Sequence, residues 1–375
     1  MTLFDLTLPE LRRRTSMKWN AFDPDVLPLW VAEMDVRQLP EVVDAVRSAM
    51  ESGDTGYPAG TGYADAYADM AETRWAWRPA PDQVRRAGDV MNAILSLLLG
   101  NTGEGDHVVL NPPVYPPFWQ VIEGYRRHIT QVPLTAAGRL DLPALEAAFT
   151  GPDKPTAYLL CSPHNPTGTI HTADELGAVA RLCREHDVLL VVDEIHALLV
   201  DPGAAFVPVL SLADAQNAVV AFSAGKGWNL PAFKAGLFIR GTDASAALAA
   251  LPPLANQSTG HMATIAHTAA LRHGQAWVDE VMAEVSGHKD LLVDLLAEHL
   301  PDVGYVRSPG TYLAWLDCSA LGLERPRDHF LTRAGVALNL GTDFGPGHGQ
   351  FVRMNLATSP AIITEAVERM AASLA

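Results

Sequence analysis

The sequence predicts an α/β protein with a mostly parallel sheet. Three short apolar runs, at 157–160, 188–192 and 218–222, have the length and composition of buried strands. Each run is followed by a polar motif: NPTG after the first, DEIH after the second and S-x-G-K after the third. Because ligands in open α/β sheets bind outside the carboxyl ends of strands, the three motifs are expected to converge on one site.

The lysine of the third motif has the most distinctive setting. Lys226 lies between Gly225 and Gly227, three residues after Ser223. Glycine lets the backbone turn sharply and lets a bulky partner approach. A lysine held there can lose its proton and act as a nucleophile or form a Schiff base. Taken alone, the stretch is better explained as a surface lysine on a glycine turn, so the functional interpretation depends on the two other motifs.

Together, the three motifs supply the side chains that pyridoxal phosphate requires. Lys226 can hold the aldehyde of the cofactor, and Asp193 can pair with its protonated pyridine nitrogen. Asn165 can donate a hydrogen bond to the phenolic oxygen of the ring. The sequence therefore predicts pyridoxal 5'-phosphate as the cofactor.

Further motifs extend over nearly the whole chain. They are RTSMKW at 14–19, LWVAEMD at 29–35, Gly56-Tyr57, TYLAWLD at 311–317 and GQFVRMN at 349–355. With NPTG and the lysine motif, the chain resembles fold-type I pyridoxal-phosphate enzymes of the class I/II aminotransferase superfamily. Within that superfamily it is similar to the cystathionine β-lyase-like (C–S lyase) branch.

The resemblance implies an architecture. The expected fold is aspartate-aminotransferase-like, with a mostly parallel seven-stranded sheet in a large domain and a small α+β domain. The large domain is expected at 46–260, and the small domain at 1–45 together with 261–375, the first part being an N-terminal arm. A homodimer with shared active sites is also implied.

Local patterns place the other elements. Apolar residues recur at helical spacing over 40–50. A helix is expected after Gly88 and up to Leu99, and a strand at 107–110. Thr172 and Glu175 have capping-box spacing at the start of a helix that is expected to reach His186.

The C-terminal third shows a long helical pattern followed by short strands. The helical pattern runs from 261 to 299, with breaks expected near Gly274 and Gly287. Strands are expected at 312–316, 336–340 and 351–354, and a closing helix at 362–374.

The resemblance also assigns the site residues. Those expected to bind the cofactor are Val90, Met91, Tyr115, Asn165, Asp193, His196, Ser223, Lys226 and Lys234. Those expected to act in catalysis are Lys226, Asp193 and Tyr57, and those expected to bind substrate are Arg353, Asn165 and Tyr57.

Five of these assignments have an alternative. In the family, a tyrosine at position 57 reaches the partner's phosphate and an aromatic ring at 115 stacks on the pyridine, but both could be ordinary loop tyrosines. His196 could be a core histidine, Lys234 a solvated lysine and Arg353 a surface ion-pair residue, although the FVRMN motif strongly favours a carboxylate clamp for Arg353.

Asp89 departs from the family pattern, which has a small residue at its position. A carboxylate there would repel the phosphate expected at the amides of Val90 and Met91, unless it turns away to cap the helix.

Bulk properties exclude several function classes. The formal net charge of −16 argues against non-specific nucleic-acid binding and against anionic membrane surfaces. The three cysteines are far apart, which is typical of reduced thiols in a cytoplasmic protein. No histidine or cysteine cluster has metal-ligand spacing, no signal peptide is expected, and no apolar run is long enough to span a bilayer.

The resemblance implies β-elimination from cystathionine or another cysteine S-conjugate, giving thiol, pyruvate and ammonia. An aminotransferase would use the same lysine, aspartate and arginine, and no single residue separates the two reactions. A regulatory protein that keeps the cofactor as a ligand is a third hypothesis. The intact Lys226, Asp193 and Arg353 argue against loss of chemistry, but they do not exclude a second role.

Overall fold

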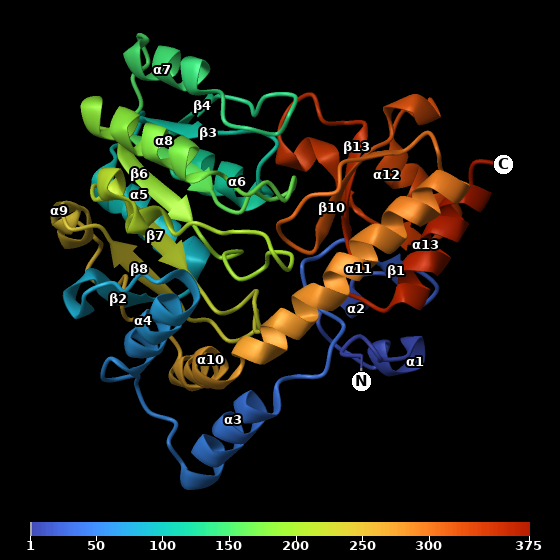
Figure 1. Cartoon of the computed structure of the whole chain (residues 1–375), viewed down its shortest axis with the longest axis horizontal. Coiled ribbons are helices and arrows are strands. Elements are labelled where there is room, and N and C mark those ends of the chain that lie inside the picture. The colour runs from blue at the N-terminus through green and yellow to red at the C-terminus, as the bar shows by residue number, and fades with distance from the viewer. Residues whose placement is uncertain (1) are drawn as a thin grey trace.

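A seven-stranded sheet forms the centre of the larger of two lobes in the computed structural model, which describes residues 2–375 (Figure 1). The strand order is β2-β8-β7-β6-β5-β3-β4. All strands run in one direction except β8, which is antiparallel to both of its neighbours. The prediction of a mostly parallel seven-stranded sheet is confirmed. The strands are β2 (Val84–Ala87), β3 (His107–Leu110), β4 (His128–Gln131), β5 (Ala157–Cys161), β6 (Leu189–Asp193), β7 (Val219–Phe222) and β8 (Gly236–Arg240).

Helices cover both faces of this sheet. Successive strand residues alternate between the faces, so Val192 belongs to the buried cluster on one face and Val191 to the cluster on the other. The first face is covered by α3 (Pro40–Ser52), α4 (Gly62–Trp75), α7 (Leu142–Thr150), α8 (Ala173–Glu185) and α10 (His261–His273). The second face is covered by α5 (Val90–Asn101), α6 (Pro116–Gly124) and α9 (Ser245–Ala249).

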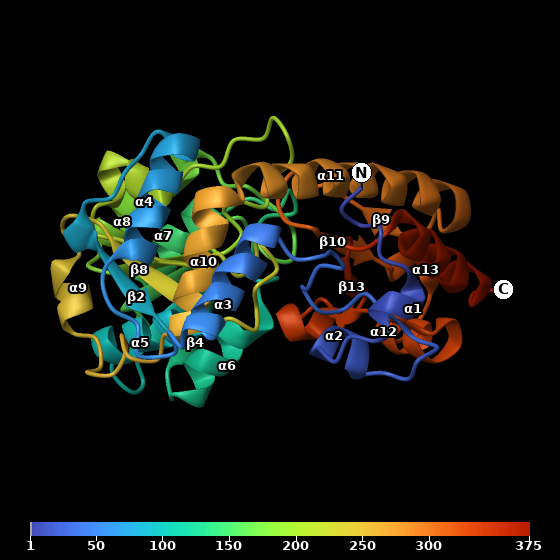
Figure 2. The ribbon, with the colours of Figure 1, turned by 90° about the horizontal axis from the view of Figure 1, so that it is seen from below.

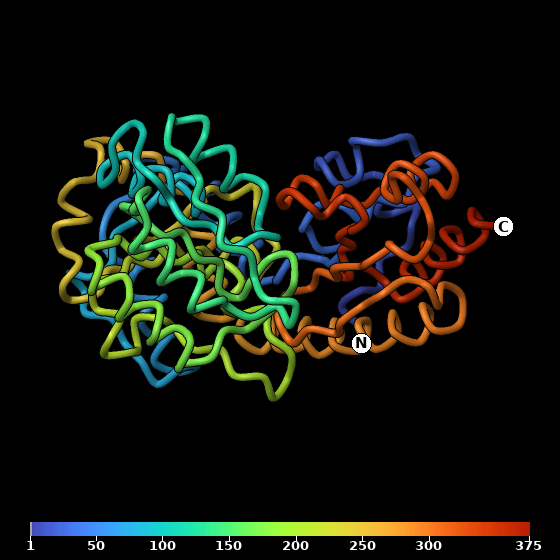
Figure 3. Tube along the Cα trace, turned by 90° about the horizontal axis from the view of Figure 1, so that it is seen from above, coloured from blue at the N-terminus to red at the C-terminus, as the bar shows by residue number. Residues whose placement is uncertain are grey.

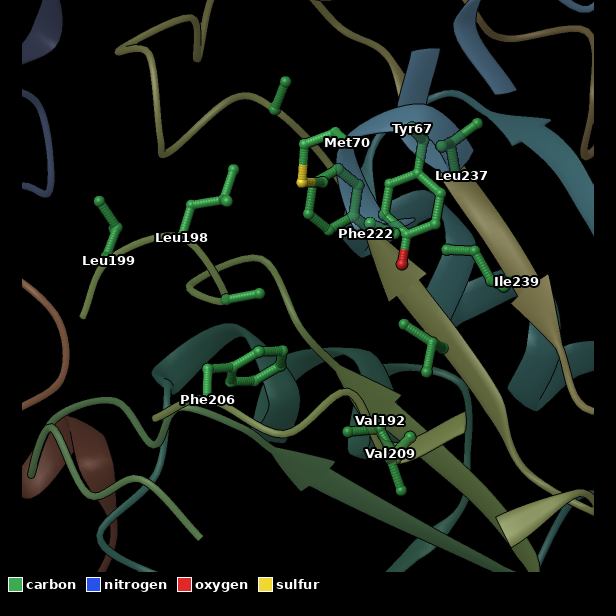
Figure 4. Close-up of a cluster of buried hydrophobic side chains, with 14 of the residues drawn as sticks. Tyr67, Met70, Val192, Leu198, Leu199, Phe206, Val209, Phe222, Leu237 and Ile239 are labelled. Carbon is green, nitrogen blue, oxygen red and sulfur yellow. The ribbon is translucent and has the colours of Figure 1, made fainter. Parts of the chain in front are cut away.

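The core on the first face is close-packed. The ring of Phe222 in β7 lies 4.6 Å, centroid to centroid, from the ring of Tyr67 in α4. Figure 4 shows these rings beside Met70, Leu237 and Ile239, so that α4 packs against β8 and against β7, whose end carries the lysine motif.

A second, four-stranded sheet organises the smaller lobe, in the order β12-β13-β10-β9. Its strands are β9 (Gly304–Tyr305), β10 (Leu313–Asp317), β12 (Asn339–Leu340) and β13 (Phe351–Asn355). The other elements of this lobe are α1 (Leu8–Leu11), α2 (Met17–Asn20), α12 (Pro326–His329), α13 (Pro360–Ala372) and a parallel pair of β1 (Leu27–Pro28) with β11 (Val336–Ala337). Figure 3 shows the two lobes side by side.

Helix α11 (Gln275–His299) connects the lobes, and Figure 2 shows it running from one to the other. The expected break at Gly274 is confirmed, because Gly274 separates α10 from α11. The expected break at Gly287 is wrong. A glycine inside a helix costs only about 1 kcal/mol, and packing along both sides of this residue keeps the helix continuous.

The strand expected at 336–340 is divided. β11 pairs with β1, whereas β12 pairs with β13 in the other sheet. The buried side chain of Leu338 lies between the two halves. An apolar pattern cannot show that a chain changes its partner strand within five residues.

The domain boundaries stay a prediction. The buried cluster on the first face of the large sheet takes in arm residues such as Met34 and helix residues such as Ala266, beyond the expected 46–260 range. None of the helices within residues 2–375 combines the length and the apolar character that crossing a membrane requires.

A buried ion pair fixes the N-terminal arm. Lys18 Nζ lies 2.6 Å from Asp35 Oδ2, and both side chains are almost fully buried. Trp19 Nε1 donates to the other oxygen of Asp35 at 2.8 Å, and Lys18 also donates to the carbonyl of Glu33 at 3.2 Å. Burial lowers the pKa of Lys18, while the charge of Asp35 opposes that shift.

Lys18→Met should lower the free energy of unfolding by about 3 kcal/mol, because it leaves the buried carboxylate of Asp35 without its closest cation. Arg47→Met removes an exposed ion pair to Asp44 and should cost less than about 1 kcal/mol. Urea unfolding followed by circular dichroism at one protein concentration measures both. Equal losses in the two variants would contradict a structural role for the buried pair.

Candidate functional site

A cavity of about 580 Å³ opens at the carboxyl ends of β5, β6 and β7. Its walls come from these strand ends, from the N-terminal arm and from the smaller lobe. Ten residues singled out from the sequence line it: Val90, Met91, Tyr115, Asn165, Asp193, His196, Ser223, Lys226, Lys234 and Arg353. The expected convergence of the three motifs at one sheet edge is therefore observed.

Asp193 ends strand β6 inside the sheet. Its register partners are Cys161 in β5 and Ala221 in β7, so the three strand ends lie level with one another. The carboxylate is buried and accepts a hydrogen bond from the N–H of Ile195 at 2.9 Å. Burial raises the pKa of Asp193 to about 7, although this N–H and the charge of Lys226 oppose the rise. A cation placed beside it in the cavity would stabilise its charged form.

Lys226 follows β7 and extends toward the N-terminal arm, where Nζ donates to the carbonyl of Ala32 at 2.8 Å. Burial lowers the pKa of Lys226 to about 8, and the charge of Arg353 adds to the effect. A substantial fraction of this amine is therefore neutral near pH 8, as a nucleophile or proton acceptor requires.

Arg353 lies in β13 of the smaller lobe, with its guanidinium buried in the cavity wall. It donates to Asn165 Oδ1 at 3.0 Å and to the carbonyl of Trp30 at 2.9 Å, and Asn339 accepts a third bond. Its Nε has no partner among the residues that the structure describes. Burial lowers the pKa of Arg353 to about 10, so the group stays cationic at neutral pH and suits a carboxylate.

The N-terminus of α5 faces the cavity. Asp89 is its N-cap and accepts from the N–H of Asn92 at 2.7 Å, which confirms the capping arrangement that the sequence left conditional. Val90 and Met91 are the first two helical residues, so their N–H groups have no carbonyl of their own helix to bind. Lys234 Nζ lies 3.0 Å from Asp89 Oδ2. The helix end and the lysine together form a place suited to an anion.

Three more lining residues have distinct surroundings. Ser223 Oγ donates to the carbonyl of Ala235 at 2.7 Å and accepts from the N–H of Gly225 at 3.0 Å. Burial and the two site cations lower the pKa of His196 to about 3, so its ring is neutral, and its Nδ1 has no partner among residues 2–375. Tyr115 is partly buried at the start of α6, with its ring 5.6 Å from that of Phe118.

Tyr57 lies outside this cavity. Its side chain is 97% exposed, in the loop between α3 and α4. The structure of one chain therefore does not bring it to the other site residues, and its role stays a prediction.

Sequence reasoning missed three groups that the structure adds. The carbonyl of Ala32 carries no residue-type signal, because every residue has one. Asn339 is the register partner of Arg353 across β12 and β13, and the sequence does not reveal strand register. Asp343 lines the cavity from the loop before β13; an acidic residue in a glycine-rich loop is too common to single out.

The residues present fit pyridoxal phosphate. The free helix N–H groups and Lys234 match a phosphate, and a buried carboxylate with one hydrogen-bond partner matches a protonated ring nitrogen. Within the described part of the chain, Nδ1 of His196 and Nε of Arg353 have no hydrogen-bond partner, so both atoms are available to a ligand. Within the described residues, no group of three or more His, Cys, Asp or Glu side chains could hold a metal ion.

Comparisons with known proteins agree with this geometry. The family model for "Aminotransferase class I and II" matches residues 24–370. The chain is 45% identical to the Mycobacterium leprae protein described as "Putative cystathionine beta-lyase", over 99% of this chain and 98% of that one. It is 31% identical to "Cystathionine beta-lyase PatB" of Bacillus subtilis, over 96% of each chain.

Solved structures show the same fold. A "putative plp-dependent beta-cystathionase" from Corynebacterium diphtheriae superposes with a TM-score of 0.94 at 28% identity, covering 100% of this chain and 99% of that one. The prediction of an aspartate-aminotransferase-like fold is confirmed.

In protein prepared free of carbonyl ligands, amine labelling of Lys226 should be half-maximal near pH 8, because burial lowers its pKa to about that value. Brief exposure to acetic anhydride over a pH series, read by peptide mass spectrometry, measures this. Exposed Lys154 serves as the internal reference.

Arg353→Met should move the midpoint for Lys226 upward, since a neighbouring positive charge that disfavours the ammonium is removed. A midpoint for Lys226 equal to that of Lys154, and unmoved by this substitution, would contradict the assigned environment.

Proposed function

The chain belongs to the aminotransferase class I and II family, and on that premise we propose that it is a pyridoxal-phosphate-dependent carbon–sulfur β-lyase. The proposed reaction converts cystathionine or another cysteine S-conjugate and water to a thiol, pyruvate and ammonia. One observation carries the proposal: Lys226, Asp193 and Arg353 meet in one cavity of a chain that is 45% identical, over nearly its full length, to a protein described as a cystathionine β-lyase.

Pyridoxal phosphate, when bound, supplies an aldehyde that combines with amines and a ring that accepts the electron pair released at the substrate's α carbon. The N–H groups of Val90 and Met91, with Lys234, would hold its phosphate. Asp193 would hold the proton on the ring nitrogen, and Asn165 and Tyr115 would fix the position of the ring.

Arg353 would bind the substrate's α-carboxylate through its guanidinium, which is already oriented by Asn165 and Asn339. With the carboxylate fixed, the α carbon is presented to Lys226. The neutral amine of Lys226 takes the α proton, because burial has lowered its pKa into the working range. The carbon–sulfur bond would break with its electron pair leaving on sulfur, as a thiolate that departs readily because the pKa of a thiol is about 8.5. The thiolate takes up a proton to give the thiol, and the remaining three-carbon fragment reacts with water to give pyruvate and ammonia.

We also infer a homodimer in the cytoplasm. Tyr57 is 97% exposed on a protruding loop, where it is available to a neighbouring subunit. The three cysteines are free and buried, as in a reducing compartment. We keep 46–260 as the large cofactor-binding domain and the rest of the chain as the small domain.

The rival activity is amino transfer, which the family model's description also covers. With cystathionine or S-propyl cysteine and no oxo-acid, the protein should complete many turnovers and release thiol, pyruvate and ammonia in equal amounts. Only elimination needs a leaving group on the β carbon, so amino transfer from alanine or aspartate should be slow. If turnover stopped after one equivalent until an oxo-acid was added, amino transfer would replace elimination as the proposed function.

Asp193→Asn should lower kcat on the order of 100-fold, because the fixed charge that stabilises the reacting state is lost. Glu194→Gln is the matched control. Glu194 is the next residue in the chain and is equally buried. Its carboxylate accepts from the N–H of Val209 and does not line the cavity. Initial rates and thermal unfolding of both variants separate chemistry from folding. An Asp193→Asn enzyme as active as the Glu194→Gln enzyme would remove Asp193 from this role.

A further inference from the structure

Asp343 is an acidic group of the cavity that the proposed mechanism does not use. It lies in the 3-10 turn Gly341–Phe344, between β12 and β13, and its side chain lines the cavity where this opens to solvent. Among residues 2–375, no ion pair within 4 Å and no hydrogen bond of its carboxylate is found.

The other acids of the cavity wall have partners. Asp89 pairs with Lys234 at 3.0 Å, and Asp193 accepts from Ile195. The cation that acts on Asp343 is Arg327, whose charge opposes the rise in the pKa of Asp343 that burial causes. Arg327 donates instead to Asp328 at 2.8 Å, so the carboxylate of Asp343 keeps an unmatched charge.

The backbone around Asp343 is fixed rather than free. The carbonyl of Phe344 accepts from the N–H of Val114 in the larger lobe at 2.8 Å. Gly345 has φ of 137°, and a Cβ there would meet Pro112 at 2.9 Å. The turn is therefore packed against the larger lobe, which holds Asp343 at the mouth of the cavity.

The orientation of the substrate in the cavity follows from the positions of Arg353 and Lys226. Its α-carboxylate would bind Arg353, and its α carbon would face Lys226, both in the buried part of the cavity. The sulfur substituent would then extend toward the mouth, where Met17, Gln120 and Asp343 are the exposed lining residues from the arm, α6 and the smaller lobe.

We propose that Asp343 selects cysteine S-conjugates whose thiol portion carries an ammonium group, by pairing with that cation at the cavity mouth. The inference rests on the proposed lyase function and names its substrate class. A partly exposed ion pair of this kind changes specificity modestly, by about two- to fivefold.

The test compares two substrates that differ only at the far end. S-(2-aminoethyl)-L-cysteine carries the ammonium, and S-propyl-L-cysteine replaces it with a methyl group. The native enzyme should prefer the aminoethyl substrate in kcat/KM, and Asp343→Asn should lower that preference about two- to fivefold. The preference of the native enzyme should also weaken with added salt. Asp302→Asn, which removes an exposed acid that does not line the cavity, is the control.

Binding without turnover gives the second measurement. L-Lysine has the chain length of S-(2-aminoethyl)-L-cysteine, and L-2-aminoheptanoate has that of S-propyl-L-cysteine, but neither has a sulfur to expel. Calorimetry gives the dissociation constants of both. Asp343→Asn should weaken L-lysine binding about two- to fivefold relative to L-2-aminoheptanoate.

The outcomes are distinguishable. A preference unchanged by Asp343→Asn, or equal losses on both substrates, overturns the role of Asp343. If the native enzyme eliminated thiol from neither substrate, the proposed lyase function would fail, and the two binding measurements would still decide whether Asp343 recognises a cation.

Discussion

The structure depends on hydrogen bonds between site side chains and the backbone of the N-terminal arm. The carbonyl of Ala32 accepts from Lys226 at 2.8 Å and from Tyr312 at 3.0 Å. The carbonyl of Trp30 accepts from Arg353, and that of Val31 from Asn355. The stretch of the arm at 30–32 is therefore held by groups from both lobes, so its placement and the geometry of the site are set by the same contacts.

Burial is the main cause of the pKa shifts in the cavity. Burial lowers the pKa of His196, and the charges of Lys226 and Arg353 lower it further, so its ring stays neutral. Asp193 is a buried acid close enough to Lys226 for each to affect the pKa of the other. A buried site with opposed charges and few internal ion pairs is costly to maintain, and such costs are typical of sites that bind a charged ligand.

Much of this arrangement could be predicted from the sequence. The strands before Asn165, Asp193 and Lys226 are short apolar runs, and parallel strands place their carboxyl ends at one edge, so convergence followed from local pattern and one topological rule. The cap formed by Asp89 was one of two arrangements that the sequence allowed, because an aspartate before an apolar helix can accept from the first free N–H groups.

Other features were beyond sequence reasoning, for physical reasons. The pairing of Asn339 with Arg353 depends on strand register, and the exchange of partners between β11 and β12 depends on tertiary packing. The acceptor for Lys226 is a backbone carbonyl, which has no sequence signal. The break expected at Gly287 is wrong because the free-energy cost of a glycine in a helix does not include the packing of the neighbouring residues, which outweighs it.

The continuity of α11 has a consequence for how the molecule comes apart. Val281 and Val285 of this helix are buried in the core of the larger lobe, whereas Leu292 and Leu296 are buried in the core of the smaller one. Between them, Lys289 Nζ lies 2.6 Å from Asp201 Oδ1 in a buried ion pair. Unfolding of the smaller lobe would expose the apolar residues in the second half of α11 and this ion pair to water. We therefore expect the two lobes to unfold as one cooperative unit, although each has its own sheet.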